Sequence, residues 1–271
     1  MEQTGGIERL LRRDRLGVAM LIATLFGVAS LYTVSGIGMK MSALEMTAMD
    51  GMRDMPSSDV PGSWSTDYML LVFLMWWIMM IAMMLPSASP TVLLYSALLR
   101  RGAAARHAPA LSAVFLSGYL TAWAAFSVMA TILHHALETW GLVSSTMMTL
   151  INTVPGALLL ITAGLFQFST LKHICLQHCR SPAEFITRSR RPGAMGAFRM
   201  GLQHGSYCLG CCWSLMALLF VGGVMNLYWI AALAGFVAIE KLLPRGDLVS
   251  KAAGTFLMLW GGYLLVGMLT S

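Results

Sequence analysis

Cysteines and a histidine crowd the segment 201–216, which reads GLQHGSYCLGCCWSLM. At about 100° per residue, a helix places His204, Cys208 and Cys211 within roughly 60° of arc, with Cys212 near the same face. Thiolate and imidazole groups bind soft or borderline cations such as Cu(I) and Zn²⁺. Ionisable side chains near the middle of a membrane helix are functional candidates. The alternatives are inert buried thiols and a disulfide between Cys211 and Cys212.

A second group of soft and borderline donors lies in the segment 172–180, which reads KHICLQHCR. Its candidate ligands for Cu(I) or Zn²⁺ are His173, Cys175, His178 and Cys179. Cys175 and Cys179 share a face if the segment is helical. The spacing matches no standard zinc module, and an exposed, reduced cytoplasmic segment is the alternative.

Methionines recur in the apolar segment 68–90, and the chain holds 23 of them. Met75, Met79 and Met83 recur every four residues and therefore share one helical face, with Met80 and Met84 on an adjacent face. Pro86 and Pro90 are expected to disturb the inner end of this helix and to free backbone carbonyls. The thioethers offer a soft-metal path, and packing between helices is the alternative.

The polar segment before this helix carries a second set of methionines at a strict spacing of three: Met46, Met49, Met52 and Met55. Thioether sulfur needs no deprotonation, so it can bind a soft ion outside the cell. Asp50, Asp54 and Asp59 would attract a cation. We favour a low-affinity entry site over the alternative, an amphipathic helix on the lipid surface.

The elements that must position these groups are membrane helices, because 57% of the residues are hydrophobic and only 11% are charged. Soluble domains carry about 25% charged residues. We expect an all-α bundle, one membrane domain over 1–271, with about seven apolar spans. These spans are 16–36, 67–90, 108–134, 149–171, 195–222, 224–243 and 250–270.

Basic residues fix the expected orientation of these spans. Apart from Lys40 and Arg53, every lysine and arginine falls in loops on one side. The positive-inside rule therefore predicts a cytoplasmic N-terminus and an extracytoplasmic C-terminus. The methionine-rich loop 37–66 would lie outside, and the basic loop 172–194 would lie in the cytoplasm. We expect the extracytoplasmic loop to be irregular.

Several function classes lack support in this sequence. In a membrane protein a net charge of +6 marks cytoplasmic loops and does not indicate nucleic-acid binding. Five clustered cysteines do not suit a disulfide framework. No phosphate-binding glycine loop, HExxH motif or serine–histidine signature is present, so no catalytic residue is assigned. We interpret His134 with Glu138 as interfacial residues, with an outer metal site as the alternative. We interpret Glu240 with Lys241 as a pair that snorkels to the headgroups, with an ion pair or a proton-coupling carboxylate as the alternatives.

Two motifs resemble the signature blocks of a bacterial family of predicted metal-binding integral membrane proteins, a domain of unknown function. They are the run W-x2-M-x2-A-M-M-x-P that ends at Pro86 and the run H-G-x2-C-x-G-C-C-W-x-L-M from His204 to Met216. The run E-K-x2-P-x-G from Glu240 also fits, and the likeness covers roughly 65–270. The resemblance implies metal binding. Separately, the loop methionines and the Met79–Met83 pair resemble motifs of copper importers in ligand chemistry alone.

These observations predict a membrane protein that binds and transports or delivers Cu(I), with zinc as the second choice of metal. The loop methionines would capture the ion, the membrane methionines would receive it, the 204–212 group would hold it, and the 173–179 group would release it. Partners would be the lipid bilayer, a metal chaperone or membrane enzyme, and further subunits of an oligomer. A membrane thiol–disulfide oxidoreductase using Cys208, Cys211 and Cys212, and an accessory subunit of a membrane enzyme complex, are the alternatives.

Overall fold

The computed structural model describes residues 3–37, 42–49, 63–102, 105–243 and 245–270, and these ranges fold into helices without a named strand, as predicted. In chain order the elements are α1 (Gln3–Ser35), α2 (Ala43–Ala48), α3 (Thr66–Arg100), η1 (Ala105–His107), α4 (Ala108–Thr139), α5 (Thr153–Phe166), α6 (Thr170–Arg180), α7 (Pro182–Arg188), α8 (Gly193–Ala217), α9 (Leu219–Gly222), α10 (Leu227–Leu242) and α11 (Gly246–Thr270). The fold class is therefore confirmed as all-α.

Five segments within the described residues are long and apolar enough to cross a membrane. They are Leu16–Ser35, Thr66–Arg100, Ala105–Thr139, Gly193–Gly222 and Gly246–Met268. α5 and α6 meet at 63° and add a sixth crossing if they form one bent span. α10 is shorter, at 16 residues. These helices indicate a membrane protein, and the seventh crossing stays a prediction that depends on α10.

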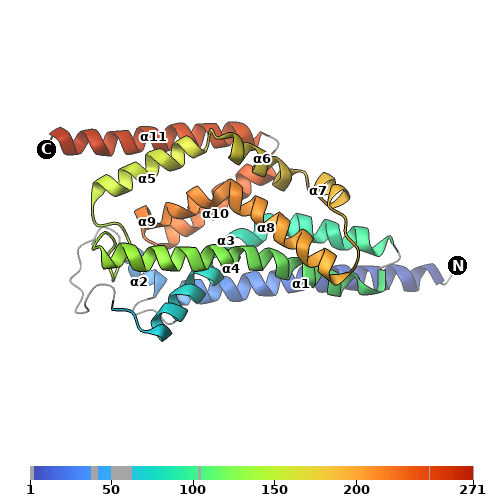
Figure 1. Ribbon diagram of the computed structural model, residues 1–271. Helices are drawn as coiled ribbons and strands as arrows, with labels where there is room; N and C mark the ends of the chain where they lie inside the picture. The colour runs from blue at the N-terminus through green and yellow to red at the C-terminus, as the bar shows by residue number, and fades with distance from the viewer. Residues whose placement is uncertain (1–2, 38–41, 50–62, 103–104, 244, 271) are drawn as a thin grey trace.

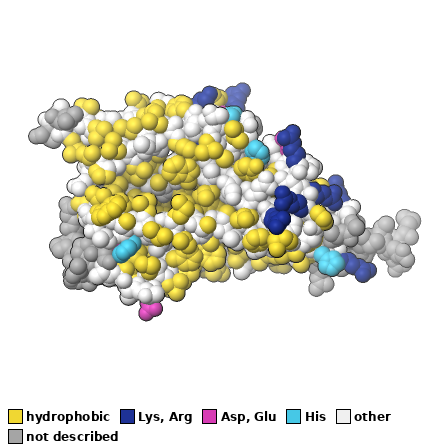
Figure 2. Space-filling view, in the orientation of Figure 1, with side chains coloured by type: hydrophobic (Ala, Val, Ile, Leu, Met, Phe, Trp, Pro, Cys, Tyr) yellow, Lys and Arg dark blue, Asp and Glu magenta, His cyan; other side chains and the backbone are white. Residues whose placement is uncertain are grey.

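Successive long helices run in opposite directions, so the chain begins at one end of the bundle and finishes at the other (Figure 1). The lysine and arginine side chains on the visible face gather on the half of the molecule where α1 begins (Figure 2). Hydrophobic side chains cover much of the remaining face. This distribution is the one that the positive-inside rule needs, and the cytoplasmic N-terminus remains a prediction.

α3 continues as one helix through Pro86 and Pro90. Pro90 has no N–H, so the carbonyl of Pro86, four residues earlier, loses its helical donor. The Ser89 hydroxyl donates to that carbonyl at 2.8 Å. The Ser87 hydroxyl likewise donates to the Met84 carbonyl at 2.9 Å. Local serines therefore supply hydrogen bonds in the proline segment, which explains why the helix does not end there.

α8 lies directly against α4 because glycines remove the side chains between them. A Cβ on Gly201 would collide with the Phe115 carbonyl, and one on Gly205 would lie 2.6 Å from the Ala122 Cβ. On another face of α8, a Cβ on Gly210 would lie 2.6 Å from the Cys175 sulfur of α6. Small residues thus allow two neighbouring helices to reach the cysteine-bearing part of α8.

Both segments expected as loops contain helices. In the methionine-rich segment 37–66, α2 begins with a capping box between Ser42 and Glu45, whose hydrogen bonds lower the pKa of the Glu45 carboxyl. Thr47 of α2 accepts a hydrogen bond from the Leu227 N–H at the start of α10, at 2.9 Å. A cap and a tertiary contact therefore hold a short helix over 43–48 within this segment.

Candidate metal centre

The three cysteines of α8 are buried, with 0–1% of each residue's surface exposed. The Cys211 and Cys212 thiols donate to the Cys208 carbonyl at 3.1 and 2.8 Å, the usual bonds of a side chain to the preceding helical turn. All five cysteines of the chain are free, so the structure holds no disulfide between Cys211 and Cys212. The predicted thiol cluster therefore exists as reduced sulfurs inside the bundle.

Two further helices bring polar groups to the Cys208 sulfur. Lys241 of α10 places its Nζ 2.9 Å from the sulfur, and Tyr119 of α4 places its hydroxyl at 3.1 Å. The same Tyr119 hydroxyl lies 3.4 Å from the Met84 carbonyl. An adjacent ammonium favours the thiolate form of a cysteine, which is the form that binds metals. Neither Lys241 nor Tyr119 was a candidate site residue in the sequence.

Methionine sulfur reaches the thiol cluster from α3. The Met84 sulfur lies 3.9 Å from the Cys212 sulfur, and both side chains are fully buried. The five methionines between positions 75 and 84 are all buried: Met75, Met79, Met80, Met83 and Met84. Met84, which contacts the Cys212 thiol, does not belong to the predicted path of Met75, Met79 and Met83. It lies on the adjacent face of the same helix. Its place beside Cys212 depends on how α3 crosses α8, which periodicity does not reveal.

His204 is buried one turn before Cys208 on α8. Its ring lies among three aromatic rings, with centroid distances of 6.1 Å to Phe115, 5.7 Å to Tyr119 and 5.3 Å to Phe185. The Nδ1 atom of His204 has no hydrogen-bond partner among the described residues. This imidazole therefore has an unsatisfied nitrogen in an aromatic cage beside the thiols.

The 173–179 group divides between two faces of α6. The Cys175 sulfur covers Gly210 of α8. Cys179 lies one turn later on the same face of α6 and packs against the core. His173 is half exposed and lies 3.6 Å from Asp247. The His178 ring stacks on Tyr207, with centroids 4.2 Å apart. The two cysteines therefore extend the α8 cluster, and the two histidines lie apart from it.

The loop methionines are only partly visible. Met46 is buried in the core on α2, Met49 is half-buried at its end, and Met52 and Met55 lie outside the described residues. The proposed capture site as a set therefore has no described geometry. Met46 packs in the hydrophobic core, as methionine side chains commonly do.

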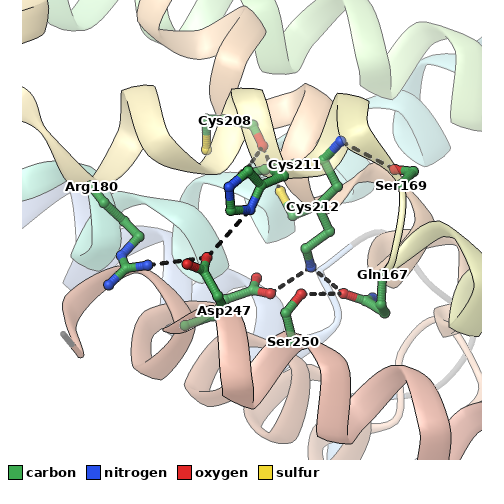
Figure 3. Close-up of polar contacts among 11 residues, drawn as sticks. Gln167, Ser169, Arg180, Cys208, Cys211, Cys212, Asp247 and Ser250 are labelled. Atoms are coloured by element: carbon green, nitrogen blue, oxygen red, sulfur yellow. Dashed lines mark hydrogen bonds and ion pairs between the residues drawn. The ribbon is translucent and has the colours of Figure 1, made fainter. Parts of the chain in front are cut away.

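Glu240 and Lys241 do not snorkel to the membrane surface, because both are buried. Glu240 forms an ion pair with Lys172 of α6 at 2.6 Å, and Lys172 also donates to Gln167 at the break before α6. Ser250 of α11 donates to the same Gln167 oxygen at 3.1 Å (Figure 3). Adjacent residues of α10 thus face different neighbours, and the interfacial interpretation of this pair was wrong.

His134 and Glu138 are also buried, near the C-terminal end of α4. Neither ring nitrogen of His134 has a hydrogen-bond partner among the described residues, and Ser145 donates to Glu138 at 3.0 Å. Trp64 and Phe220 pack edge-on against the imidazole, with centroids 5.4 and 5.6 Å away. Both side chains therefore lie between helices and do not face the surroundings of the bundle.

Across the described residues, no three His, Cys, Asp or Glu side chains are grouped to hold a metal ion. Protein-bound zinc is almost always four-coordinate in structural sites. Sulfur pairs that include a methionine, such as Cys212 with Met84, suit a soft cation that needs fewer ligands. The contact of the Cys212 thiol with the Met84 thioether therefore offers two soft sulfur atoms to a metal.

Comparison with known proteins agrees with this chemistry. The model of the PpoB2 family, described as copper chaperone, matches residues 73–264, which is most of the chain. The matched region includes α3 from its second turn, α8 and α10, and therefore every residue around the thiol cluster. No curated protein and no solved structure matches the chain. The chain belongs to this copper chaperone family.

Proposed function

Starting from membership of the copper chaperone family, we propose that this chain is a membrane-embedded chaperone that holds Cu(I) between α3 and α8. The observation that carries the proposal is the buried contact between the Met84 thioether and the Cys212 thiol, with Cys208 one turn away. Cys208 and Cys212 would supply thiolates and Met84 a neutral soft ligand. Cys211 of α8 and Cys179 of α6 would offer further thiolates on the side of the bundle toward α6.

The sulfur ligands form a graded series along the proposed route. Met49, Met52 and Met55 would capture the ion outside the membrane. The buried Met46 of α2 would receive it next, and the buried methionines of α3 would conduct it inward. Thioethers bind more weakly than thiolates, so an ion moves from the former to the latter. Cys175 and Cys179, at the α6–α8 contact, would then receive it, with His173 and His178 on the exposed face of α6 as the exit. The membrane is proposed to be the bacterial cytoplasmic membrane.

Delivery to a partner is the purpose that the family name favours over bulk transport. No phosphate-binding loop is present to drive a pump. A soft ion held by a few exchangeable sulfurs can instead pass to a stronger acceptor by ligand exchange. We therefore propose a membrane enzyme or a soluble metal carrier as the recipient.

Metal analysis of the purified protein tests this proposal. After anaerobic loading under reducing conditions, the wild type should retain about one or more copper ions per chain. Replacing Cys208, Cys211 and Cys212 by serine should abolish retention, since hydroxyl groups are poor ligands for a soft ion. Cys175→Ser removes a thiol of α6 and leaves the three cysteines of α8 unchanged. This variant should still retain copper at the central site. Copper content near zero in the loaded wild type would refute the proposal.

A thiol oxidoreductase is the second candidate, and the 2.9 Å contact between Lys241 and Cys208 favours it. A thiolate beside an ammonium is also an activated nucleophile for disulfide exchange. Thiol trapping in intact cells distinguishes the two functions. An oxidised fraction of Cys208 that changes with quinone supply supports exchange chemistry, and a uniformly reduced cluster excludes it.

A further inference from the structure

Lys241 carries a buried charge that no carboxylate neutralises. Its Nζ lies 2.9 Å from the Cys208 sulfur and 3.4 Å from the Ser87 hydroxyl. Glu240, the adjacent residue, is already paired with Lys172 at 2.6 Å. Among the side chains that the structure describes, none with a carboxylate forms an ion pair with Lys241. The Cys208 sulfur, at 2.9 Å, is therefore the nearest group that could carry a counter-charge for Lys241.

A thiolate at Cys208 would supply that counter-charge across the 2.9 Å contact. A buried charge is costly unless it is paired and hydrogen-bonded. Ammonium and thiolate together form a neutral pair, and the Tyr119 hydroxyl is placed to donate to the same sulfur. In the membrane interior, where unpaired ions are rare, such a pair is the expected arrangement.

The charge of the cluster then depends on which cation enters. A Cys208 thiolate, a Cys212 thiolate, one monovalent cation and the Lys241 ammonium sum to no net charge. A divalent cation on the same thiolates would leave one positive charge uncompensated in the membrane interior. The fixed ammonium therefore penalises divalent cations and tolerates monovalent ones.

We propose that Lys241 is a specificity-determining residue that makes the thiol site select a soft monovalent cation, Cu(I) or Ag(I), over Zn²⁺ and Cd²⁺. This inference rests on the proposed copper site of Cys208 and Cys212. One unit-charge interaction over about 6 Å at an effective dielectric constant of about 20 corresponds to roughly a 100-fold change in affinity. Removal of the Lys241 charge should shift the preference between the two cation classes by about that factor.

Competition binding on the full-length protein in detergent measures this preference. Wild type, Lys241→Met and Lys241→Arg are each loaded anaerobically with an equimolar mixture of Ag(I) and Cd²⁺, and bound metals are quantified. Lys241→Met should lower the silver-to-cadmium affinity ratio by roughly 100-fold, whereas Lys241→Arg, which keeps the charge, should retain it. Lys251→Met changes an exposed lysine of α11 and serves as the control.

A second variant leaves Lys241 in place and tests the same charge. Ser87→Asp adds a carboxylate near the Lys241 ammonium, and Ser87→Asn is its uncharged control. Neutralising the ammonium should shift the ratio toward cadmium, in the same direction as Lys241→Met. Ser87→Asp decides the matter if Lys241→Met does not fold, as judged by size-exclusion chromatography.

The outcomes separate the two proposals. A wild-type ratio in folded Lys241→Met and in Ser87→Asp overturns the role of Lys241 while leaving the copper site intact. A wild type that binds neither silver nor copper refutes the proposed function and this inference with it. A shift toward cadmium in both variants, absent from the Lys251→Met, Lys241→Arg and Ser87→Asn proteins, supports the inference.

Discussion

At the scale of single residues, the chemistry depends on which atoms meet across helix boundaries. Cys212 contributes a thiol from α8 and Met84 a thioether from α3, 3.9 Å apart in a fully buried place. Cys208 lies one turn away and is paired with Lys241 from α10. Each ligand type is soft or charge-balanced, which is what a buried Cu(I) site requires.

Replacing Met84 by leucine tests the thioether at this site. The substitution conserves volume and apolarity, so folding should change little, by less than about 1.5 kcal/mol. Loss of the soft ligand should weaken Cu(I) binding by roughly tenfold or more in competition with a Cu(I) chelator. Met195→Leu, at a methionine of α8 that is 65% exposed, is the matched control. Equal affinities for the two variants would remove Met84 from the site.

The sequence predicted the identity of the buried thiols and methionines better than their partners. Spacing along one helix placed His204, Cys208 and Cys211 near one face, and composition placed that helix in a membrane. The contacts of Cys208 with Tyr119 and Lys241 join residues 89 and 33 positions apart. Helical periodicity carries no information on such tertiary contacts. Adjacent charges such as Glu240 and Lys241 resemble an interfacial pair until the packing of α10 is known.

At the scale of elements, a buried ion pair connects α6 with α10. α6 carries Cys175 and Cys179, and α10 carries Lys241. Lys172 of α6 and Glu240 of α10 lie 2.6 Å apart and are almost inaccessible to solvent. Gln167 and Ser250 extend the network to the α5–α6 break and to α11. This network holds α6 against α10, and therefore keeps Cys175 and Cys179 beside α8.

Glu240→Gln should destabilise the protein strongly because it leaves the Lys172 ammonium buried without its partner. Removal of one member of a buried pair costs about 3–5 kcal/mol. The double variant Lys172→Met/Glu240→Gln should recover much of that loss, since no unpaired charge remains. Chemical unfolding in detergent measures both variants. If the double variant were as unstable as Glu240→Gln, the ion pair would not be the cause.

The close approach of α4 and α8 gives a second prediction at this scale. Gly201→Ala should cost about 1–3 kcal/mol, because its Cβ would collide with the Phe115 carbonyl and force the helices apart. Gly262→Ala on α11 is the matched control, since its Cβ would meet no atom within 4 Å. Thermal unfolding compares the two. Equal stability of the two variants would contradict the observed packing.

At the scale of the whole molecule, the helices divide the chain between two sides of a membrane. In the part of the chain that the structure describes, five segments are long enough to cross, and α5 with α6 adds a sixth if the two form one bent span. α10 is the candidate for the predicted seventh crossing. Its 16 residues extend about 24 Å at about 1.5 Å per residue, against a hydrocarbon core of about 30 Å. Composition predicted this architecture, and the short α10 is where composition alone could not fix the number of crossings.

Reporter fusions at the two termini show whether the number of membrane crossings is odd or even. We expect the N-terminus in the cytoplasm, because basic residues mark the loops on that side, and the C-terminus outside. That result requires an odd number of crossings. If α5 and α6 together form the bent sixth span, the odd number is seven and α10 is a span. Reporters that place both termini in the cytoplasm would show an even number and would exclude the predicted orientation of α11.

The central claim is that buried sulfur atoms of α8 and α3 hold Cu(I). X-ray absorption spectroscopy at the copper edge, on reduced full-length protein loaded with copper, tests it most directly. We predict a monovalent edge and a first shell of sulfur atoms, with fewer sulfurs in Met84→Leu and no ordered shell when Cys208 and Cys212 are replaced by serine. A divalent edge, or a shell dominated by nitrogen and oxygen, would contradict the claim.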